Sequence, residues 1–358
     1  MRITRRHFLA AATSASVLAM AGGSALASAV AGPSGAANAA RWHRYSATST
    51  EGQKMLASYA RGVGEMLKLP PDNPHNWFRQ AFIHLMDCPH GNWWFYVWHR
   101  GYVAHMEQMI RRYSGDADFA MPYWDWTGEP QIPASMFKDV LTPTDSAYRP
   151  YTGTLEAFSA IKPYLKRYWD GLDQAQRGQL ALREYREFED VWNSVIGLNP
   201  STGAVEPGDA ALATTDTARY LSADNPLLDE KTRDAVSPEK IKAGLAPVDF
   251  YNDNISASFT SSRTSSHMLM GNFSLLESFP HNKVHNCIGG VGPLDPGPYG
   301  NMTNFLSPVD PVFFLHHANM DRLWEIWNRK QLASNLPILP VDAGQRQAFV
   351  EEPFVFFV

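Results

Sequence analysis

Hydrophobic residues recur at helical spacing in several stretches of this chain. Between residues 51 and 67, and again between 77 and 85, apolar side chains return every third or fourth position, which predicts amphipathic helices. Prolines between these two stretches predict a loop. A third helix is predicted within the segment GNWWFYVWHRGYVAHMEQMIRRY. One face of that helix would carry Phe95, His99, Val103, Met106 and Ile110.

The second half of the chain contains two further predicted helices. One should begin near Pro280, and another should span about residues 312–330. Residues 161–192 have helical periodicity with many charges, whereas residues 199–226 are rich in Gly, Pro, Ala and Thr and predict a long loop. We assign no function to this middle region (137–266). The predicted fold class is mainly α, a helix bundle with long loops and little β structure.

The first 40 residues have the composition of a targeting segment. A basic start precedes an apolar run and then small residues, with several A-x-A cleavage options up to Ala39. The Arg5-Arg6 pair resembles a twin-arginine signal, although an ordinary secretory signal with a chance arginine pair stays open. We therefore expect residues 1–40 to be removed and residues 41–358 to form one mature domain, which is exported and either periplasmic or secreted.

Composition excludes several classes of function. The chain has 358 residues, of which 44% are hydrophobic and 11 are Trp, enough for a large globular core. A net charge of −5 provides no basic field for nucleic acid. After the leader, no apolar run approaches the roughly 18 residues of a spanning helix, so we expect no membrane association. The two cysteines form no disulfide framework, although a Cys88–Cys287 bridge stays open in an oxidising compartment.

Histidines cluster in two parts of the chain beside aromatic runs. The segment QAFIHLMDCPHGNWWFYVWHRGYVAHMEQ contains the first trio, His84, His90 and His99. The segments LESFPHNKVHNCIGG and SPVDPVFFLHHANMDRLW contain the second trio, His281, His285 and His317. Three neutral imidazoles per metal, with almost no carboxylate or thiolate among the candidate ligands, favour copper over zinc or iron.

The spacing of these histidines predicts how they are held. His281 and His285 are four residues apart, so a helix places both on one face. His90 and His99 are nine apart, about two and a half turns, and one continuous helix would point them in opposite directions. His90 is therefore predicted in the loop before the helix that carries His99. A single histidine on an apolar helix face is usually structural, but six in two groups favour metal binding.

The other histidines lack this context. Three that we expect on the surface or outside the ligand set are His43, His75 and His267. His316 directly precedes His317 and is predicted to lie beside the site without binding metal. Asp321, one turn after His317, is predicted either to orient that imidazole or to pair with Arg322.

These segments resemble the tyrosinase family of coupled binuclear copper proteins, which includes catechol oxidases and, more distantly, molluscan haemocyanins. The resemblance covers about residues 77–126 and 275–327, and its most specific parts are PYWDW and DPVFFLHHANMDRLW. It implies that the first trio binds one copper ion and the second trio the other. One departure is Tyr96, where the family usually has an aliphatic residue or Phe.

The resemblance also implies roles for three other residues. Cys88 stands two before His90, where fungal members link the sulfur to the imidazole ring by a thioether; a plain thiol is the alternative. Glu277, four before His281, matches a carboxylate of plant members that can accept a phenol proton. An exposed loop glutamate without a role is the alternative. Asn282 resembles the residue that helps orient water in members acting on monophenols.

By this resemblance the chain is a copper-dependent phenol oxidase. It would use O2 to oxidise o-diphenols to o-quinones and, in a true tyrosinase, hydroxylate monophenols, with the quinones coupling as in pigment formation. The alternatives are an o-aminophenol oxidase and haemocyanin-like reversible O2 binding without catalysis; a hydrolytic metal centre would favour carboxylates. Expected partners are small phenols, O2 and a copper-delivery helper protein. Family cores continue past an EEPFVFF-like strand into a Tyr-x-Tyr segment, and this sequence ends before it.

Overall fold

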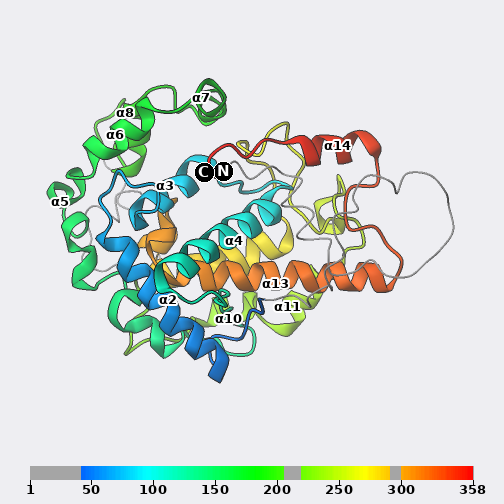
Figure 1. The fold of residues 1–358 in the computed structure, drawn as a ribbon. Coiled ribbons are helices and arrows are strands. Elements are labelled where there is room, and N and C mark those ends of the chain that lie inside the picture. Colours follow the sequence, from blue (N-terminus) through cyan, green and yellow to red (C-terminus); the bar gives the residue numbers. More distant parts are fainter. Residues whose placement is uncertain (1–41, 205–218, 291–299, 358) are drawn as a thin grey trace, which may run out of the picture.

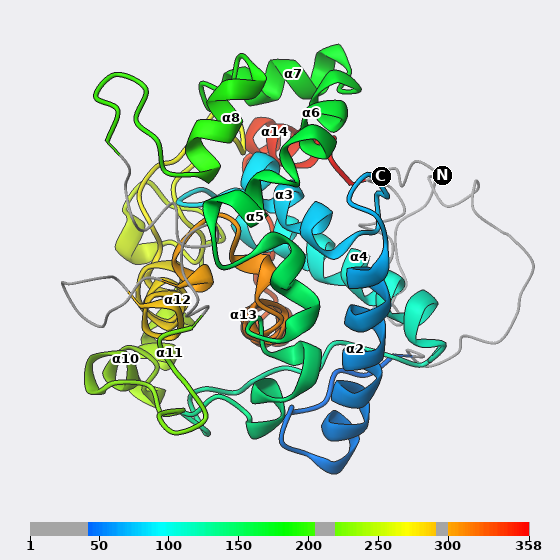
Figure 2. The same ribbon diagram turned by 90° about the vertical axis from the view of Figure 1, so that its left-hand side faces the viewer.

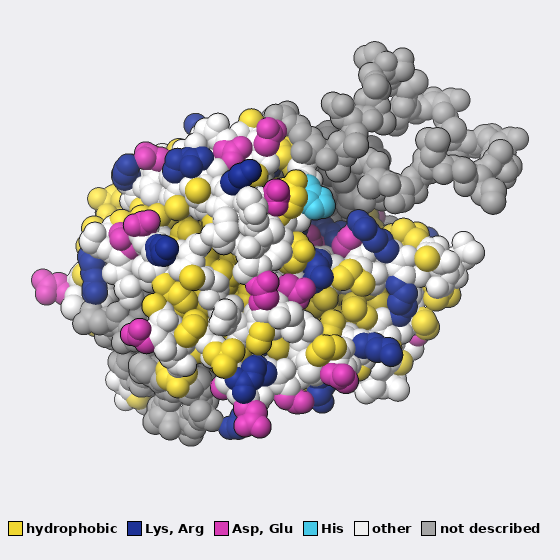
Figure 3. Space-filling model, turned by 90° about the horizontal axis from the view of Figure 1, so that it is seen from below, with side chains coloured by type: hydrophobic (Ala, Val, Ile, Leu, Met, Phe, Trp, Pro, Cys, Tyr) yellow, Lys and Arg dark blue, Asp and Glu magenta, His cyan; other side chains and the backbone are white. Residues whose placement is uncertain are grey.

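The fold is mainly helical, as predicted. A computed structural model describes residues 42–204, 219–290 and 300–357, and the predicted leader lies outside them. In these residues β structure is limited to isolated bridges, such as the one between Ser46 and Tyr123. None of the described helices combines the length and apolar character needed to cross a membrane. On the face shown in Figure 3, acidic and basic side chains are interspersed, in keeping with the small net charge.

Long helices form the centre of the molecule, and shorter ones surround them (Figure 1). The α-helices are α2 (Thr50–Lys68), α3 (Trp77–Asp87), α4 (Phe95–Ser114), α5 (Leu155–Ser159), α6 (Lys162–Asp170), α7 (Gln174–Ala181), α8 (Phe188–Val195), α10 (Glu230–Ala235), α11 (Pro238–Gly244), α12 (Asn282–Gly289), α13 (Val312–Ala333) and α14 (Ala343–Glu351). The short helical turns are η1 (Ala134–Phe137), η2 (Asp139–Leu141), η3 (Ser146–Tyr151), η4 (Ile255–Ala257), η5 (Glu277–His281), η7 (Asn301–Thr303) and η8 (Ser307–Val309).

Helix α4 packs against both α2 and α13, and these three helices enclose much of the core. Viewed from the side, α13 runs through the middle, with α2 on one side and α12 on the other (Figure 2). The predicted apolar face of α4 is buried, from Phe95 to Ile110. Tyr96, the departure from the family pattern, is buried too, with its ring stacked on Phe259 at 4.9 Å between centroids. The core accommodates this phenol by aromatic stacking.

Capping explains where the predicted helices begin and end. The Ser49 hydroxyl accepts a hydrogen bond from the Gly52 N–H at the start of α2, and Asn76 caps α3 through the Arg79 N–H. Helix α4 ends at Gly115, whose φ of 73° is the left-handed conformation that glycine adopts without a Cβ penalty. The predicted helices at 51–67, 77–85 and 312–330 are confirmed within a few residues.

The helix predicted near Pro280 begins earlier than expected and with a different geometry. Its first turn, η5, is π-helical, and Pro280 lies inside it. A proline in a regular α-helix lacks one N–H and clashes with the preceding turn, and the wider π turn accommodates it. This turn sets the direction of His281 at the point where α12 begins.

The middle region forms a separate group of short helices. Residues 161–192, predicted as helical, contain α6, α7 and α8, which lie together beyond α3 and α5 (Figures 1 and 2). The predicted 199–226 loop is non-helical at both ends, and its central residues, 205–218, lie outside the described part of the chain. The alternative of a Cys88–Cys287 bridge is wrong, because both cysteines are buried free thiols.

Candidate metal centre

The first trio comes together from three consecutive segments. His84 lies in the last turn of α3, His90 in the following loop and His99 in the second turn of α4. Their ring centroids form a nearly equilateral triangle, with separations of 5.5 Å (His84–His90), 5.7 Å (His84–His99) and 5.5 Å (His90–His99). The predicted loop position of His90 is confirmed. This loop position lets the His90 ring face the same point as the His99 ring on α4.

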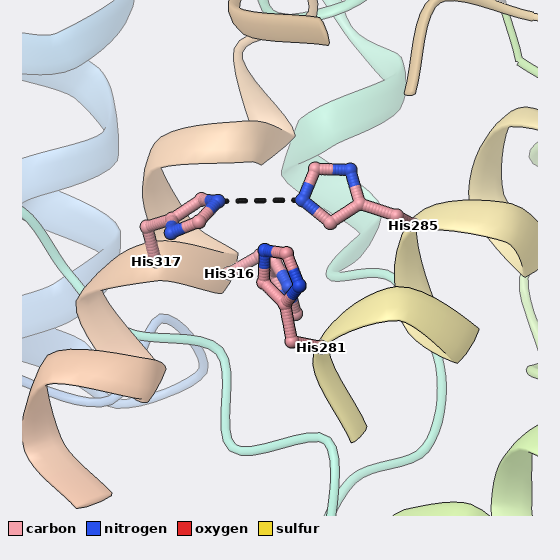
Figure 4. Close-up of side chains that lie close together, drawn as sticks. All are labelled: His281, His285, His316 and His317. Carbon is pink, nitrogen blue, oxygen red and sulfur yellow. Dashed lines mark hydrogen bonds between the residues drawn. The ribbon is translucent and has the colours of Figure 1, made fainter. Parts of the chain in front are cut away.

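The second trio comes from two helical segments that lie side by side (Figure 4). His281 closes the π turn, His285 follows one turn later on α12, and His317 lies on α13. Their ring centroids are 4.6 Å (His281–His285), 5.0 Å (His281–His317) and 5.5 Å (His285–His317) apart. The Nε2 atoms of His285 and His317 lie 3.3 Å from each other, so both point into one small space.

The two trios share a boundary. The rings of His99 and His317 stack with centroids 4.3 Å apart and an interplanar angle of 6°. His281 lies 5.8 Å from His90. The Phe95 ring lies between the two trios, with its centroid 4.5 Å from that of His99 and 4.7 Å from that of His281. Six histidines separated by up to 233 positions therefore meet in one buried aromatic setting.

Hydrogen bonds at Nδ1 orient five of the six rings, and in four of them Nδ1–H donates to an oxygen. The Nδ1 contacts are His84 to the Phe305 carbonyl (2.7 Å), His99 to the Phe95 carbonyl (2.8 Å), His285 to the Met302 carbonyl (2.7 Å), His281 to Asn282 Oδ1 (2.8 Å) and His90 to Cys88 Sγ (3.4 Å). Donation through Nδ1–H leaves the Nε2 lone pair for a metal. Segment 301–305 supplies an acceptor to each trio and so ties them together.

Several buried nitrogen atoms fit a metal ion. The Nε2 atoms of His84, His99 and His281 have no hydrogen-bond partner in the described part of the chain. Burial, the largest effect, lowers the pKa of His99 to about 3 and that of His285 to about 4, so both rings are neutral. Neutral imidazoles with free lone pairs match the ligands that copper prefers, and the two groups of candidate ligands among the described residues contain one thiol, Cys88, and no carboxylate.

Glu277 is buried, so the alternative of an exposed loop glutamate is wrong. One carboxylate oxygen accepts a hydrogen bond from the Gly91 N–H at 2.7 Å, and the other accepts one from the Ser261 hydroxyl. Burial raises the pKa of Glu277 to about 8, against the opposing effect of these two hydrogen bonds. The side chain thus connects the π turn to the loop that carries His90.

Asp321 does not act as predicted. Its carboxylate is engaged by Arg44 and Arg100, each at 2.5 Å, and it orients neither His317 nor Arg322. Burial by itself would raise the pKa of Asp321, but the two guanidinium groups outweigh it and hold the pKa below its usual value. The carboxylate therefore stays charged and paired with these arginines. Arg322 faces Asp125 instead, at 3.3 Å.

His267 lies outside both trios, as expected, but the alternative of a surface position is wrong. It is fully buried, with Nδ1 2.6 Å from Glu352 and Nε2 2.9 Å from Asp87. Asp87 also accepts a hydrogen bond from the Trp98 indole at 2.7 Å and directly precedes Cys88. No local pattern signals this contact, since the carboxylates are 180 and 85 positions from His267.

A family comparison agrees with this site. The description "Common central domain of tyrosinase" matches residues 37–330. The chain belongs to the tyrosinase family. Proteins of this family use a pair of copper ions with O2 as co-substrate, and the two trios fit that cofactor.

Known relatives are distant members of this family. Polyphenol oxidase II of Ipomoea batatas is 23% identical over 77% of this chain and 40% of its own length. Tyrosinase HcTyr1 of Hahella sp. is 24% identical over 78% of this chain and 52% of its own length. The chain thus spans about half the length of the curated relatives it matches. The solved tyrosinase of Burkholderia thailandensis is 21% identical, with a TM-score of 0.46 over 85% of this chain and 64% of that one.

Proposed function

We propose that this chain is a copper-dependent phenol oxidase that uses O2 to oxidise o-diphenols to o-quinones, and that monophenols are a second substrate class. The observation that carries the proposal is the shared boundary of two trios of neutral histidines, with His99 stacked on His317 at 4.3 Å. When bound, the copper pair supplies redox chemistry, because each cuprous ion can give one electron to O2. The first trio would hold one ion and the second trio the other.

The surroundings of the first trio suit a flat apolar substrate. The ring of Phe305 lies 5.7 Å from that of His90 and is 41% exposed, so it offers an apolar surface between solvent and the site. Its carbonyl meanwhile orients His84. A phenol ring packing on Phe305 would present its oxygen toward the histidines, an arrangement typical of apolar sites with few polar groups.

Cys88 lies where a thioether to His90 could form. Its Sγ is 3.4 Å from His90 Nδ1, and burial raises the pKa of the thiol to about 12. We propose this link because His90 is the one ligand of its trio that no helix holds. The link would form with loss of the thiol hydrogen and one ring C–H hydrogen, with O2 as the two-electron oxidant, so the intact mass would be lower by two hydrogen atoms.

Glu277 is our candidate for the group that accepts the phenol proton. Its pKa of about 8 is closer to the ordinary phenol pKa of about 10 than the pKa of a normal carboxylate is. Transfer of the phenol proton to Glu277 therefore costs less free energy. Glu277→Gln should slow monophenol turnover by roughly 100-fold or more and catechol turnover less, because a monophenol is the weaker acid at its reacting site. Steady-state O2 uptake with tyrosine and with catechol measures both.

The isosteric glutamine serves as its own packing control. Its amide oxygen can still accept from Gly91 and its amide nitrogen can donate to Ser261, so the His90 loop should stay in place. Copper content should therefore be unchanged. Equal losses on both substrates would rule out the base role and assign Glu277 to holding the loop.

Asn282 should affect copper binding through His281. Its Oδ1 is the only acceptor recorded for the His281 Nδ1–H within the described residues, at 2.8 Å. Asn282→Leu should weaken copper retention about 10- to 100-fold, as is usual when a group that orients a metal ligand is removed. Competition with a copper chelator measures this. Asn282→Asp keeps an acceptor and should retain copper; equal loss in both variants would disprove the orienting role.

Oxygen uptake by the copper-loaded protein tests the function as a whole. Tyrosine, catechol and o-aminophenol should be compared side by side on one preparation. Uptake with catechol and tyrosine supports the full proposal, and uptake with catechol alone removes the monophenol class. Uptake with o-aminophenol alone favours an o-aminophenol oxidase, and reversible O2 binding without uptake favours a carrier.

The cellular setting follows from the leader. We propose that residues 1–40 are a twin-arginine signal and that 41–358 form the mature copper domain, exported to the periplasm or beyond. That route carries folded cargo, which suits a protein loaded with copper by a helper protein before export. Quinones released there would couple into melanin-like pigment. The N-terminal sequence of the exported protein tests this proposal.

A further inference from the structure

A seventh histidine lies against the second trio. His316 is fully buried, and one of its ring nitrogens lies within 4.8 Å of the ligand nitrogens of His281, His285 and His317. Its ring is 4.9 Å from that of His285 and 5.3 Å from that of His281. Figure 4 shows the four rings facing one another. By proximity alone His316 could be a fourth ligand.

At His316 the Nδ1 atom accepts a hydrogen bond, whereas at His281 and His285 it donates one. In His281 and His285, Nδ1 faces an oxygen acceptor and must carry the ring proton. In His316, Nδ1 accepts from the Trp126 indole N–H at 3.1 Å. An indole nitrogen can only donate, so His316 Nδ1 must present its lone pair to Trp126, and the single proton of the neutral ring is on Nε2. Neither nitrogen then has a free lone pair for a metal, although Nε2 has no hydrogen-bond partner among the described residues.

The protein holds Trp126 firmly in this position. Its side chain is fully buried, and the same short segment is tied to the His316 helix where the Trp124 N–H donates to the Leu315 carbonyl at 3.2 Å. An imidazolium has no lone pair on either nitrogen, so the hydrogen bond donated by the Trp126 indole itself requires a neutral His316 ring. The indole thus fixes which nitrogen carries the proton.

We propose that Trp126 is a positioning residue that keeps His316 from binding the second copper ion. The inference rests on the proposed assignment of His281, His285 and His317 as its ligands. A catalytic metal needs a coordination position left open for its substrate, whereas a closed ligand set is typical of structural sites. By holding the His316 tautomer, Trp126 would leave three imidazoles to bind that ion and room beside it for O2 or phenol.

The proton positions can be measured directly by NMR of protein labelled with 15N-histidine. Cuprous ions are diamagnetic, so the protein can be studied anaerobically with both ions bound. We expect His316, assigned by loss of its signals in His316→Gln, to carry its proton on Nε2. In Trp126→Phe, Nδ1 loses its donor, so the ring proton should move from Nε2 to Nδ1 and Nε2 should bind copper; catechol turnover should fall about tenfold or more.

Two variants separate this role from packing. Trp124→Phe is the matched control: Trp124 is equally buried, but its indole donates to the Glu129 carbonyl at 2.8 Å, so His316 should be unchanged. Adding His316→Gln to Trp126→Phe should restore much of the catechol turnover, because the competing imidazole is gone. A purely structural role would make the double variant worse than Trp126→Phe.

The wild-type spectrum decides the matter even if Trp126→Phe does not fold. A proton on Nδ1 of His316 would overturn the inference, as would retention of the Nε2 proton in a folded Trp126→Phe protein. Copper analysis of the same wild-type sample separates the two proposals. Two ions per chain with the wrong tautomer contradicts the role of Trp126 alone. Fewer than two ions contradicts the ligand assignment and, with it, this inference.

Discussion

His285→Ala should leave one copper ion per chain instead of two and reduce catechol oxidation to the uncatalysed rate. Removal of this ring leaves the second ion only two proposed ligands, because His285 Nε2 lies 3.3 Å from His317 Nε2 and shares its space. The pair of ions would give O2 two electrons at once, one from each ion, and a single ion could not supply both. Elemental analysis and O2 uptake on the same sample measure both effects.

His105→Asn is the matched control for this substitution. His105 is another histidine of α4, close to Phe357 at 5.9 Å between ring centroids, and it belongs to neither trio. It should keep two copper ions and nearly full activity. Two ions retained by His285→Ala would contradict the proposed ligand set.

His267→Leu should lower the free energy of unfolding by about 3–5 kcal/mol, the usual cost of breaking a buried ion pair by removing one partner. The substitution leaves two carboxylates, Asp87 and Glu352, without their shared partner. Asp87 ends the helix that carries His84, and Glu352 begins the extended segment after α14. The loss should therefore loosen both attachments. Urea denaturation followed by tryptophan fluorescence measures it.

The effect of His267→Leu should depend on pH in a defined direction. Burial alone lowers the pKa of His267, but Asp87 and Glu352 outweigh it and raise the value above 6.5. A raised histidine pKa stabilises the fold fully below the unfolded value and less as pH rises through the folded value. The difference between wild type and His267→Leu should thus be larger at pH 6 than at pH 9.

His75→Leu is a control for the loss of a histidine side chain. His75 is partly buried, its Nδ1 faces the Tyr113 hydroxyl at 2.9 Å, and burial lowers its pKa. Its removal should cost little and should not become more damaging below pH 6. A His267→Leu difference that grows toward pH 9 would contradict the charged pair.

Local periodicity predicted the helices well because a helix repeats within a few residues. The apolar face of α4 and the start of α13 at Val312 follow from spacing alone. The nine-residue gap between His90 and His99 required a break between them, and the loop is there. Motif resemblance then assigned the histidines to two trios, which the tertiary structure brings together.

Contacts between distant segments could not be predicted in the same way. Asp321 was expected to contact His317 or Arg322 on its own helix, yet its carboxylate accepts a hydrogen bond from Arg44, 277 positions away. Glu277 was matched to a position over the site, but its hydrogen bond to Gly91 depends on how η5 meets the His90 loop. The π turn itself arises from the conflict between Pro280 and a regular helix.

The sequence by itself determined the helices, the two sets of histidines and the preference for copper, because these depend on short-range spacing and on the chemistry of the side chains. Only the tertiary structure decided which nitrogen carries the proton in rings such as those of His84, His285 and His316. That choice depends on the acceptor or donor opposite Nδ1: a carbonyl of segment 301–305 for His84 and His285, and an indole from PYWDW for His316. Such partners are set by packing between distant segments, and they distinguish the proposed ligands from His316.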